Sequence, residues 1–144
     1  MTIGHEVVGI VHSIGEDADV LKVGDRVIVS AVVNEDALDG AEVTYGLLGI
    51  GDFGGFKQFD GGQAGFVRIP FATDNCLLLP PGKDHELDYV ALADIFPTSN
   101  RALDCAGFGY GDVVVVFSAG IFTQFLLTFS HLLACLFHGN LLEL

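Results

Sequence analysis

The spacing of apolar residues changes near residue 85, and this change divides the chain into two parts. Before it, short runs of β-branched residues alternate with glycine-containing turns, which is typical of β-strands. After it, apolar residues recur at helical spacing. We therefore predict a mainly β first domain at residues 1–85 and a mainly helical segment at residues 86–144.

The first part contains four runs that favour strands and two stretches that favour loops. The run that begins at Arg26 follows a turn at Gly24 and Asp25, and the last run ends at two prolines, which cannot continue a strand. The predicted strands are residues 7–13, 26–29, 61–70 and 76–79. The predicted loops are the acidic residues 34–42 and the glycine-rich residues 46–62.

The second part is predicted to begin with helices. Helical spacing extends over residues 86–96, is interrupted at Pro97 and resumes over residues 98–106. Residues 113–117 form a continuous apolar run, Val-Val-Val-Val-Phe, as a buried parallel strand should. We expect an apolar helix to follow within residues 121–142.

Composition narrows the classes of partner. The 144-residue chain carries 19 acidic and 6 basic residues, a formal charge of −13, which argues against nucleic acid and anionic lipid as partners. Its 19 glycines suit a turn-rich β structure. The three cysteines, Cys76, Cys105 and Cys135, are widely spaced and form no CxxC pair, so we expect buried thiols in a reducing compartment, the cytoplasm.

The apolar tail has two interpretations. No charged residue occurs in residues 113–142, which is long enough for a transmembrane helix. Gly120 and Gln124 interrupt it, and no Lys or Arg follows Arg101 to anchor an interface. The alternative is a buried strand and helix without partners, whose exposed apolar surface would favour aggregation or oligomerisation.

The first candidate for chemistry is Gly4-His5-Glu6 at the start of the chain. Neutral imidazole is a preferred zinc ligand, and an adjacent carboxylate can hold or tune such a site. An isolated His-Glu pair is more often an ordinary surface feature, so its interpretation depends on the rest of the chain.

Three segments carry a family resemblance. They are GHEVVGIVHSIGEDADVLKVGDRVIV (4–29), DGGQAGFVRIPFATDNCLLLP (60–80) and ALADIFPTSNRALDCAGFGYGDVVVVFSAG (91–120). In this order they resemble the zinc-dependent medium-chain alcohol dehydrogenases. The DIFPT motif resembles the branch of glutathione-independent formaldehyde dehydrogenases, in which an Asp replaces a Cys as zinc ligand. The resemblance implies a GroES-like β-barrel catalytic domain followed by a Rossmann domain for NAD(P), and zinc-assisted interconversion of small alcohols and aldehydes.

The resemblance also assigns residues to roles. His5 and Asp94 match catalytic zinc ligands of the family, and Glu6 matches the acidic residue that follows the histidine ligand. Thr98 matches a threonine that contacts substrate or nicotinamide. Three protein ligands with one open position are what a catalytic zinc needs.

Two features of the family pattern are missing. The family's first zinc ligand, a Cys before the GHE motif, has no counterpart, so we expect a chain truncated at both ends relative to the family, with an incomplete zinc site. Residues 32–47, which match the segment of the structural zinc, contain no cysteine, and we expect no structural zinc.

The nucleotide fingerprint is also incomplete. The positions that match its three glycines are Ser118, Gly120 and Thr123, so the expected incomplete Rossmann segment keeps one glycine of the phosphate-binding turn. The sequence leaves three hypotheses. The chain is an oxidoreductase with impaired activity, a non-catalytic remnant or interaction module, or a short membrane-associated protein anchored by its tail.

Overall fold

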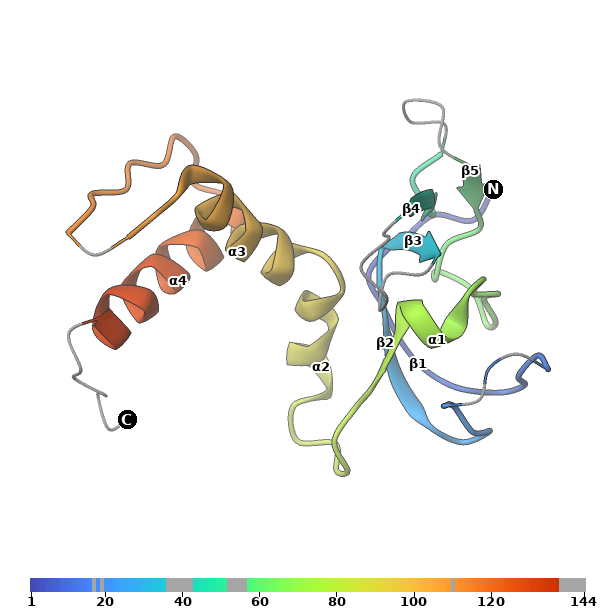
Figure 1. The fold of residues 1–144 in the computed structure, drawn as a ribbon. Helices are drawn as coiled ribbons and strands as arrows, with labels where there is room; N and C mark the ends of the chain where they lie inside the picture. Colours follow the sequence, from blue (N-terminus) through green and yellow to red (C-terminus); the bar gives the residue numbers. More distant parts are fainter. Residues whose placement is uncertain (17, 19, 36–42, 52–56, 110, 138–144) are drawn as a thin grey trace. The chain divides into compact units, whose positions relative to one another are not determined.

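The computed structural model describes residues 1–16, 18, 20–35, 43–51, 57–109 and 111–137. The chain divides into two compact units, Met1–Asp94 and Ile95–Leu144. The first unit holds all the strands that the structure describes, and the second is helical (Figure 1). The fold is therefore a mixture of sheet and helix, with the β part first, as the change of hydrophobic period predicts.

The first sheet confirms three of the four predicted strands. It consists of β1 (Val7–Ile10), β2 (Arg26–Val29) and β6 (Cys76–Leu78), in the order β1-β2-β6. Both pairings are antiparallel, and Val29 lies opposite Val7 on one side and Cys76 on the other. The prediction of a strand at residues 61–70 is wrong, because the structure has no strand there.

The second sheet overlaps both stretches that the sequence predicts as loops. It consists of β3 (Val32–Glu35), β4 (Val43–Leu48) and β5 (Lys57–Phe59), with β3 and β4 antiparallel and β4 and β5 parallel. Gly46 lies opposite Lys57, and a Cβ at Gly46 would overlap the carbonyl oxygen of Lys57. The glycine that suggests a loop thus permits a close strand contact. Residues 36–42 and 52–56 of the predicted loops lie outside the described residues.

An apolar core joins the two sheets. It is formed by the side chains of Val7, Leu21, Val27, Val29, Val33, Leu48 and Cys76. Burial raises the pKa of the Cys76 thiol to about 11, because the thiolate is poorly solvated there. Among the described residues the strands form two three-stranded sheets, and they do not close into the barrel that the resemblance implies.

Asn75 fixes the outer edge of β3. It ends the short helix α1 (Ala72–Asn75) and is almost fully buried. Its side-chain Oδ1 accepts a hydrogen bond from Asn34 N at 2.9 Å, and its Nδ2 donates to Asn34 O at 2.7 Å and to Phe71 O at 2.9 Å. These bonds satisfy backbone groups on the side of β3 that faces away from β4.

The helical run after β6 ends and restarts at Asp94, and Pro97 does not interrupt it. Helix α2 (Glu86–Tyr89) continues as the 3-10 helix η2 (Val90–Ala93), and α3 (Ile95–Ala106) follows. The prediction of an interruption at Pro97 is wrong because this proline lies in the first turn of α3. Backbone N–H groups of a first turn have no partner within the helix, so proline removes nothing there.

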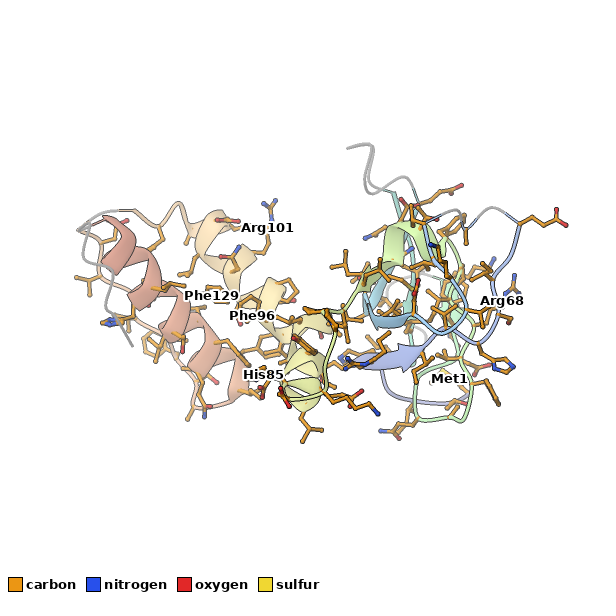
Figure 2. All side chains as sticks on the ribbon, turned by 90° about the horizontal axis from the view of Figure 1, so that it is seen from below. Met1, Arg68, His85, Phe96, Arg101 and Phe129 are labelled. Atoms are coloured by element: carbon orange, nitrogen blue, oxygen red, sulfur yellow. The ribbon has the colours of Figure 1, made fainter. Side chains whose placement is uncertain are left out.

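Helices α3 and α4 (Ile121–Phe137) pack against each other through aromatic side chains. The centroid of the Phe96 ring lies 4.3 Å from that of Phe129, in an edge-to-face arrangement (Figure 2). It lies 5.8 Å from the ring centroid of Phe125, also edge to face. Ser99 is buried beside them, and its hydroxyl donates to Ile95 O at 2.8 Å. The predicted apolar helix is confirmed to Phe137. Residues 138–142 of that prediction lie outside the described residues, and so does the Cys135 side chain.

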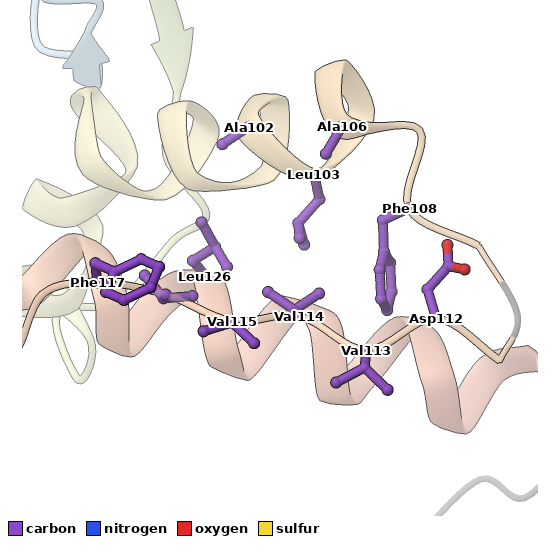
Figure 3. A pocket seen from close by; sticks show the side chains of 11 residues that line it. Ala102, Leu103, Ala106, Phe108, Asp112, Val113, Val114, Val115, Phe117 and Leu126 are labelled. Atoms are coloured by element: carbon purple, nitrogen blue, oxygen red, sulfur yellow. The ribbon is translucent and has the colours of Figure 1, made fainter.

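Residues 113–117 do not form the predicted strand. They run as an irregular segment beside α3, and none of them pairs with a described strand (Figure 3). Val113 is 88% exposed and Phe117 is 96% exposed. The prediction of a buried parallel strand is therefore wrong, because the strands needed on either side are not among the described residues. Within the part of the chain that the structure describes, no helix is both long and apolar enough to cross a membrane.

Candidate functional site

The structure brings His5 and Asp94 together from positions 89 residues apart. His5 Nε2 lies 3.0 Å from Asp94 Oδ2, and the two side chains are 35% and 25% exposed. The pair therefore lies in a partly covered position where solvent or a small molecule can reach it. Both residues belong to the first unit.

The backbone that precedes His5 packs tightly against residues 62–63. Gly4 has φ +98°, and a Cβ at this position would come within 2.9 Å of Gln63 Cγ. Gly4 O accepts a hydrogen bond from Gly62 N at 2.8 Å, and Gln63 N donates to Ile3 O at 3.1 Å. His5 is thus fixed between this contact and the start of β1 at Val7.

Asp94 is positioned by the break between two helices. Its backbone, with φ −147° and ψ −63°, interrupts η2 before α3 begins. The preceding residue, Ala93, is buried, and its carbonyl accepts a hydrogen bond from Ala31 N at 3.2 Å. This bond ties the end of η2 to the connection between β2 and β3, next to the core.

Arg26 supports the segment that leads to Asp94, and the sequence reasoning missed it. Its guanidinium donates to Glu86 Oε1 at 3.2 Å, to Pro80 O at 3.4 Å and to Gly82 O. These contacts hold residues 80–86 against β2. The sequence did contain a signal for this role, because Arg26 stands next to a run of β-branched residues. A charged residue in a half-buried strand needs a partner.

Glu6 adds a carboxylate with an unusual environment. Its Oε1 is buried and finds no hydrogen-bond partner among the residues that the structure describes. A buried carboxylate oxygen without a donor is costly, and a nearby cation would offset that cost. Glu6 therefore favours a positively charged group beside its Oε1.

The donor atoms fit zinc in kind. An imidazole nitrogen and a carboxylate oxygen are ordinary zinc ligands, whereas a catalytic zinc usually has three ligands from the protein. The described residues contain no group of three His, Cys, Asp or Glu side chains that could hold a metal ion. His5 and Asp94 thus make up two members of a possible ligand set.

The other predicted site residues lie in the second unit. Thr98 is an exposed residue of α3. Ser118 and Gly120 precede α4, and Thr123 lies in its first turn. Ser118 Oγ accepts a hydrogen bond from Gly120 N at 3.2 Å, so the amide of Gly120 already has a partner. Thr123 is 7% exposed, and its Oγ1 has no hydrogen-bond partner among the described residues.

Most of the first unit matches a known protein family. Residues 1–81 match the family described as "Alcohol dehydrogenase GroES-like domain". In the solved structure of alcohol dehydrogenase TADH from Thermus sp. ATN1, the similar region covers 91% of this chain and 39% of that protein, with a TM-score of 0.77 and 29% identity.

Curated relatives are similar over most of the chain. "Probable NADP-dependent isopropanol dehydrogenase" of Mycoplasma pneumoniae is 35% identical over 123 residues, which cover 83% of this chain and 35% of the relative. Glutathione-independent formaldehyde dehydrogenase of Pseudomonas aeruginosa is 32% identical over 136 residues, covering 83% and 33%. The chain thus spans about a third of the length of these relatives.

Proposed function

The chain belongs to the alcohol dehydrogenase family with a GroES-like domain, and on this premise we propose that it is a zinc-binding alcohol or aldehyde oxidoreductase. The contact of 3.0 Å between His5 and Asp94 carries the proposal. Two residues far apart in the sequence meet where the family resemblance assigns two ligands of one ion. The names of the relatives, isopropanol and formaldehyde dehydrogenases, support a small alcohol or aldehyde as substrate.

In this proposal each residue of the first unit has a distinct task. His5 and Asp94 would hold the zinc, and the carboxylate of Glu6, whose Oε1 is buried without a partner among the described residues, would favour its positive charge. When bound, zinc would polarise the oxygen of the alcohol or aldehyde. Since His5 and Asp94 are only two ligands, we expect them to bind zinc more weakly than a site with three.

The second unit would serve the nicotinamide cofactor. We assign residues 1–85 to the catalytic domain, and residues 86–144 to linking helices and the opening segment of a nucleotide-binding domain. The structure also divides the chain into two units, but its boundary lies after Asp94 and keeps Asp94 with the first unit. Thr98 would contact substrate or nicotinamide, and Ser118, Gly120 and Thr123 would face the NAD(P) phosphates. The Ser118–Gly120 hydrogen bond competes with phosphate, so we expect weak cofactor binding and impaired turnover.

A second candidate function is a non-catalytic interaction module. It is favoured by the occupied amide of Gly120 and by the exposed apolar side chains at residues 113–117. The two candidates differ in whether the chain binds zinc, because a non-catalytic module does not need a catalytic metal ion.

Zinc titration of the purified chain tests the proposal. We expect one zinc per chain, and His5→Ala or Asp94→Asn should weaken zinc binding at least about tenfold. His85→Ala is the matched control, because His85 also lies 3.0 Å from an aspartate, Asp88, but in an exposed pair three residues apart. Thermal unfolding of each variant checks that it is folded.

The outcomes separate the two candidates. Zinc binding that depends on His5 and Asp94, with slow NAD(P)⁺ reduction by a small alcohol, supports the oxidoreductase. Binding that His85→Ala weakens as much as His5→Ala contradicts the assigned site. Absence of both zinc binding and turnover in the folded chain favours the interaction module.

A further inference from the structure

Gly4, the residue before His5, packs against three other glycines of the first unit. Gly49 and Gly61 lie against its peptide group. Gly62 donates its N–H to the carbonyl oxygen of Gly4 at 2.8 Å. A Cβ on Gly49 would lie 2.7 Å from Gly4 N, and a Cβ on Gly61 would overlap Gly4 O. Neither position accommodates a side chain unless backbone atoms move, because packed atoms do not approach so closely.

Gly62 also lies against the chain on the far side of His5 and Glu6. A Cβ on Gly62 would overlap Cγ2 of Val7, the first residue of β1, and would lie 3.3 Å from Val7 Cβ. Val7 is buried in the apolar core, so it has little room to move. Gly62 therefore contacts the residue before His5 and the residue after Glu6. The backbone between these two contacts is fixed at both ends.

Three hydrogen bonds join residues 61–63 to residues 2–4. The amides of residues 61–63 donate to the carbonyl oxygens of residues 2–4, over distances of 2.8, 2.8 and 3.1 Å. A Cβ on Gly61 would overlap Ile3 O as well as Gly4 O. A side chain at Gly61 would thus push the two segments apart and lengthen these bonds.

The direction of the His5 side chain depends on this backbone. His5 Nε2 lies 3.0 Å from Asp94 Oδ2, although the two residues are 89 positions apart. Groups of a binding site must be held within about 0.5 Å of their productive positions. A Cβ at Gly49 or Gly61 would move the peptide of Gly4, and the imidazole would move with it.

We propose that Gly49, Gly61 and Gly62 are positioning residues for His5, which direct its imidazole toward Asp94. The expected effect on zinc rests on the proposed function, whereas the effect on the contact between His5 and Asp94 does not. The proposal gives the glycine-rich residues 46–62 a role in the candidate site.

Zinc titration of glycine variants of the full chain tests the proposal. Gly61→Ala should weaken zinc binding about tenfold to a hundredfold, as the loss of groups that orient a metal ligand does. Gly65→Ala is the matched control in the same segment, because a Cβ there would meet none of the described residues within 4 Å beyond its chain neighbours. It should bind zinc as tightly as the unmodified chain. Thermal unfolding checks that each variant is folded.

Rescue by Val7→Ala separates positioning from a general loss of stability. Gly62→Ala should weaken zinc binding, and adding Val7→Ala removes the overlapping Cγ2. The double variant should therefore bind zinc at least about fivefold more tightly than Gly62→Ala alone. Val7→Ala should not rescue Gly61→Ala, whose Cβ overlaps backbone atoms. This rescue decides the question if Gly61→Ala does not fold, and equal affinity of Gly62→Ala with and without Val7→Ala would overturn the proposal.

NMR of the metal-free chain separates the positioning role from the zinc assignment. Asp94→Asn should shift the imidazole signals of His5, because it replaces the carboxylate that lies 3.0 Å from Nε2. In Gly61→Ala the same substitution should no longer shift them. If the unmodified chain binds no zinc, the proposed function fails, and this measurement still tests the positioning of His5. An undiminished shift in Gly61→Ala, or zinc binding that Gly65→Ala weakens equally, would contradict the positioning role.

Discussion

Strand β2 and residues 113–117 have similar composition and different surroundings. Both are short runs of β-branched residues, Arg-Val-Ile-Val in β2 and Val-Val-Val-Val-Phe in the segment. β2 lies between β1 and β6, and its Val29 is 2% exposed, whereas Val113 is 88% exposed. β-propensity thus identifies segments that are able to pair, and the neighbouring strands decide whether they do.

The strongest test of this contrast replaces one valine in each region. Val29→Ala should lower the free energy of unfolding by about 2–3 kcal/mol, because it removes buried methyl groups and leaves a cavity. Val113→Ala should change it by less than about 0.5 kcal/mol, since this side chain is exposed. Urea denaturation measures both, and equal effects would contradict the difference in packing.

Cys76 gives a second test, because it lies opposite Val29 in the paired sheet. Burial raises the pKa of its thiol from 9.0 to about 11, so below pH 9 its thiolate fraction in the folded chain is roughly a hundredfold lower than in the unfolded chain. A thiol reagent at pH 8 should therefore label Cys76 much faster in urea than in buffer. The exposed Cys105 should be labelled in both.

The same pKa predicts a loss of stability at high pH. Between pH 9 and about pH 11 the unfolded chain loses the Cys76 proton and the folded chain keeps it. The unfolded state then binds fewer protons, so the free energy of unfolding falls as the pH rises through this range. Cys76→Ala should lack this contribution, and an equally steep fall in Cys76→Ala would contradict the assignment.

A further test concerns Pro97, at the start of the helix that precedes residues 113–117. Pro97→Ala should destabilise by no more than about 1 kcal/mol, through greater freedom of the unfolded chain. Arg101→Pro, in the interior of the same helix, should cost about 3 kcal/mol. Similar losses of helical circular dichroism signal in both variants would contradict the position of Pro97 in the first turn.

The strands that can be recognised from local signals alone are predicted correctly from the sequence. Residues 26–29 and 76–78 are strands as expected, because β-branched runs between clear turns suffice to identify them. The meeting of His5 with Asp94 is consistent with a shared site, although their role as zinc ligands stays a prediction. The resemblance, and not periodicity, linked these two residues.

What the sequence could not predict depends on neighbours in space. Glycines at residues 46–62 favour a loop in isolation, and the partners Val33 in β3 and Lys57 in β5 explain why Gly46 belongs to a strand. At residues 113–117 the error is the reverse, because a strong strand signal lacks partner strands among the described residues. Both errors arise since single-sequence patterns contain no information about pairing.

The hydrogen bonds of Asn75 imply a strict limit on mutational tolerance. Its side-chain amide offers one acceptor and one donor to Asn34 and so stands where a neighbouring peptide group would stand. Asp would lose the donor, Gln would be too long by one methylene, and Leu would leave the partly buried N–H and C=O of Asn34 without these partners. One amide side chain thus seals an edge of the first unit that would otherwise invite another strand. Few residue types can occupy this position, even though it lies outside every proposed binding site.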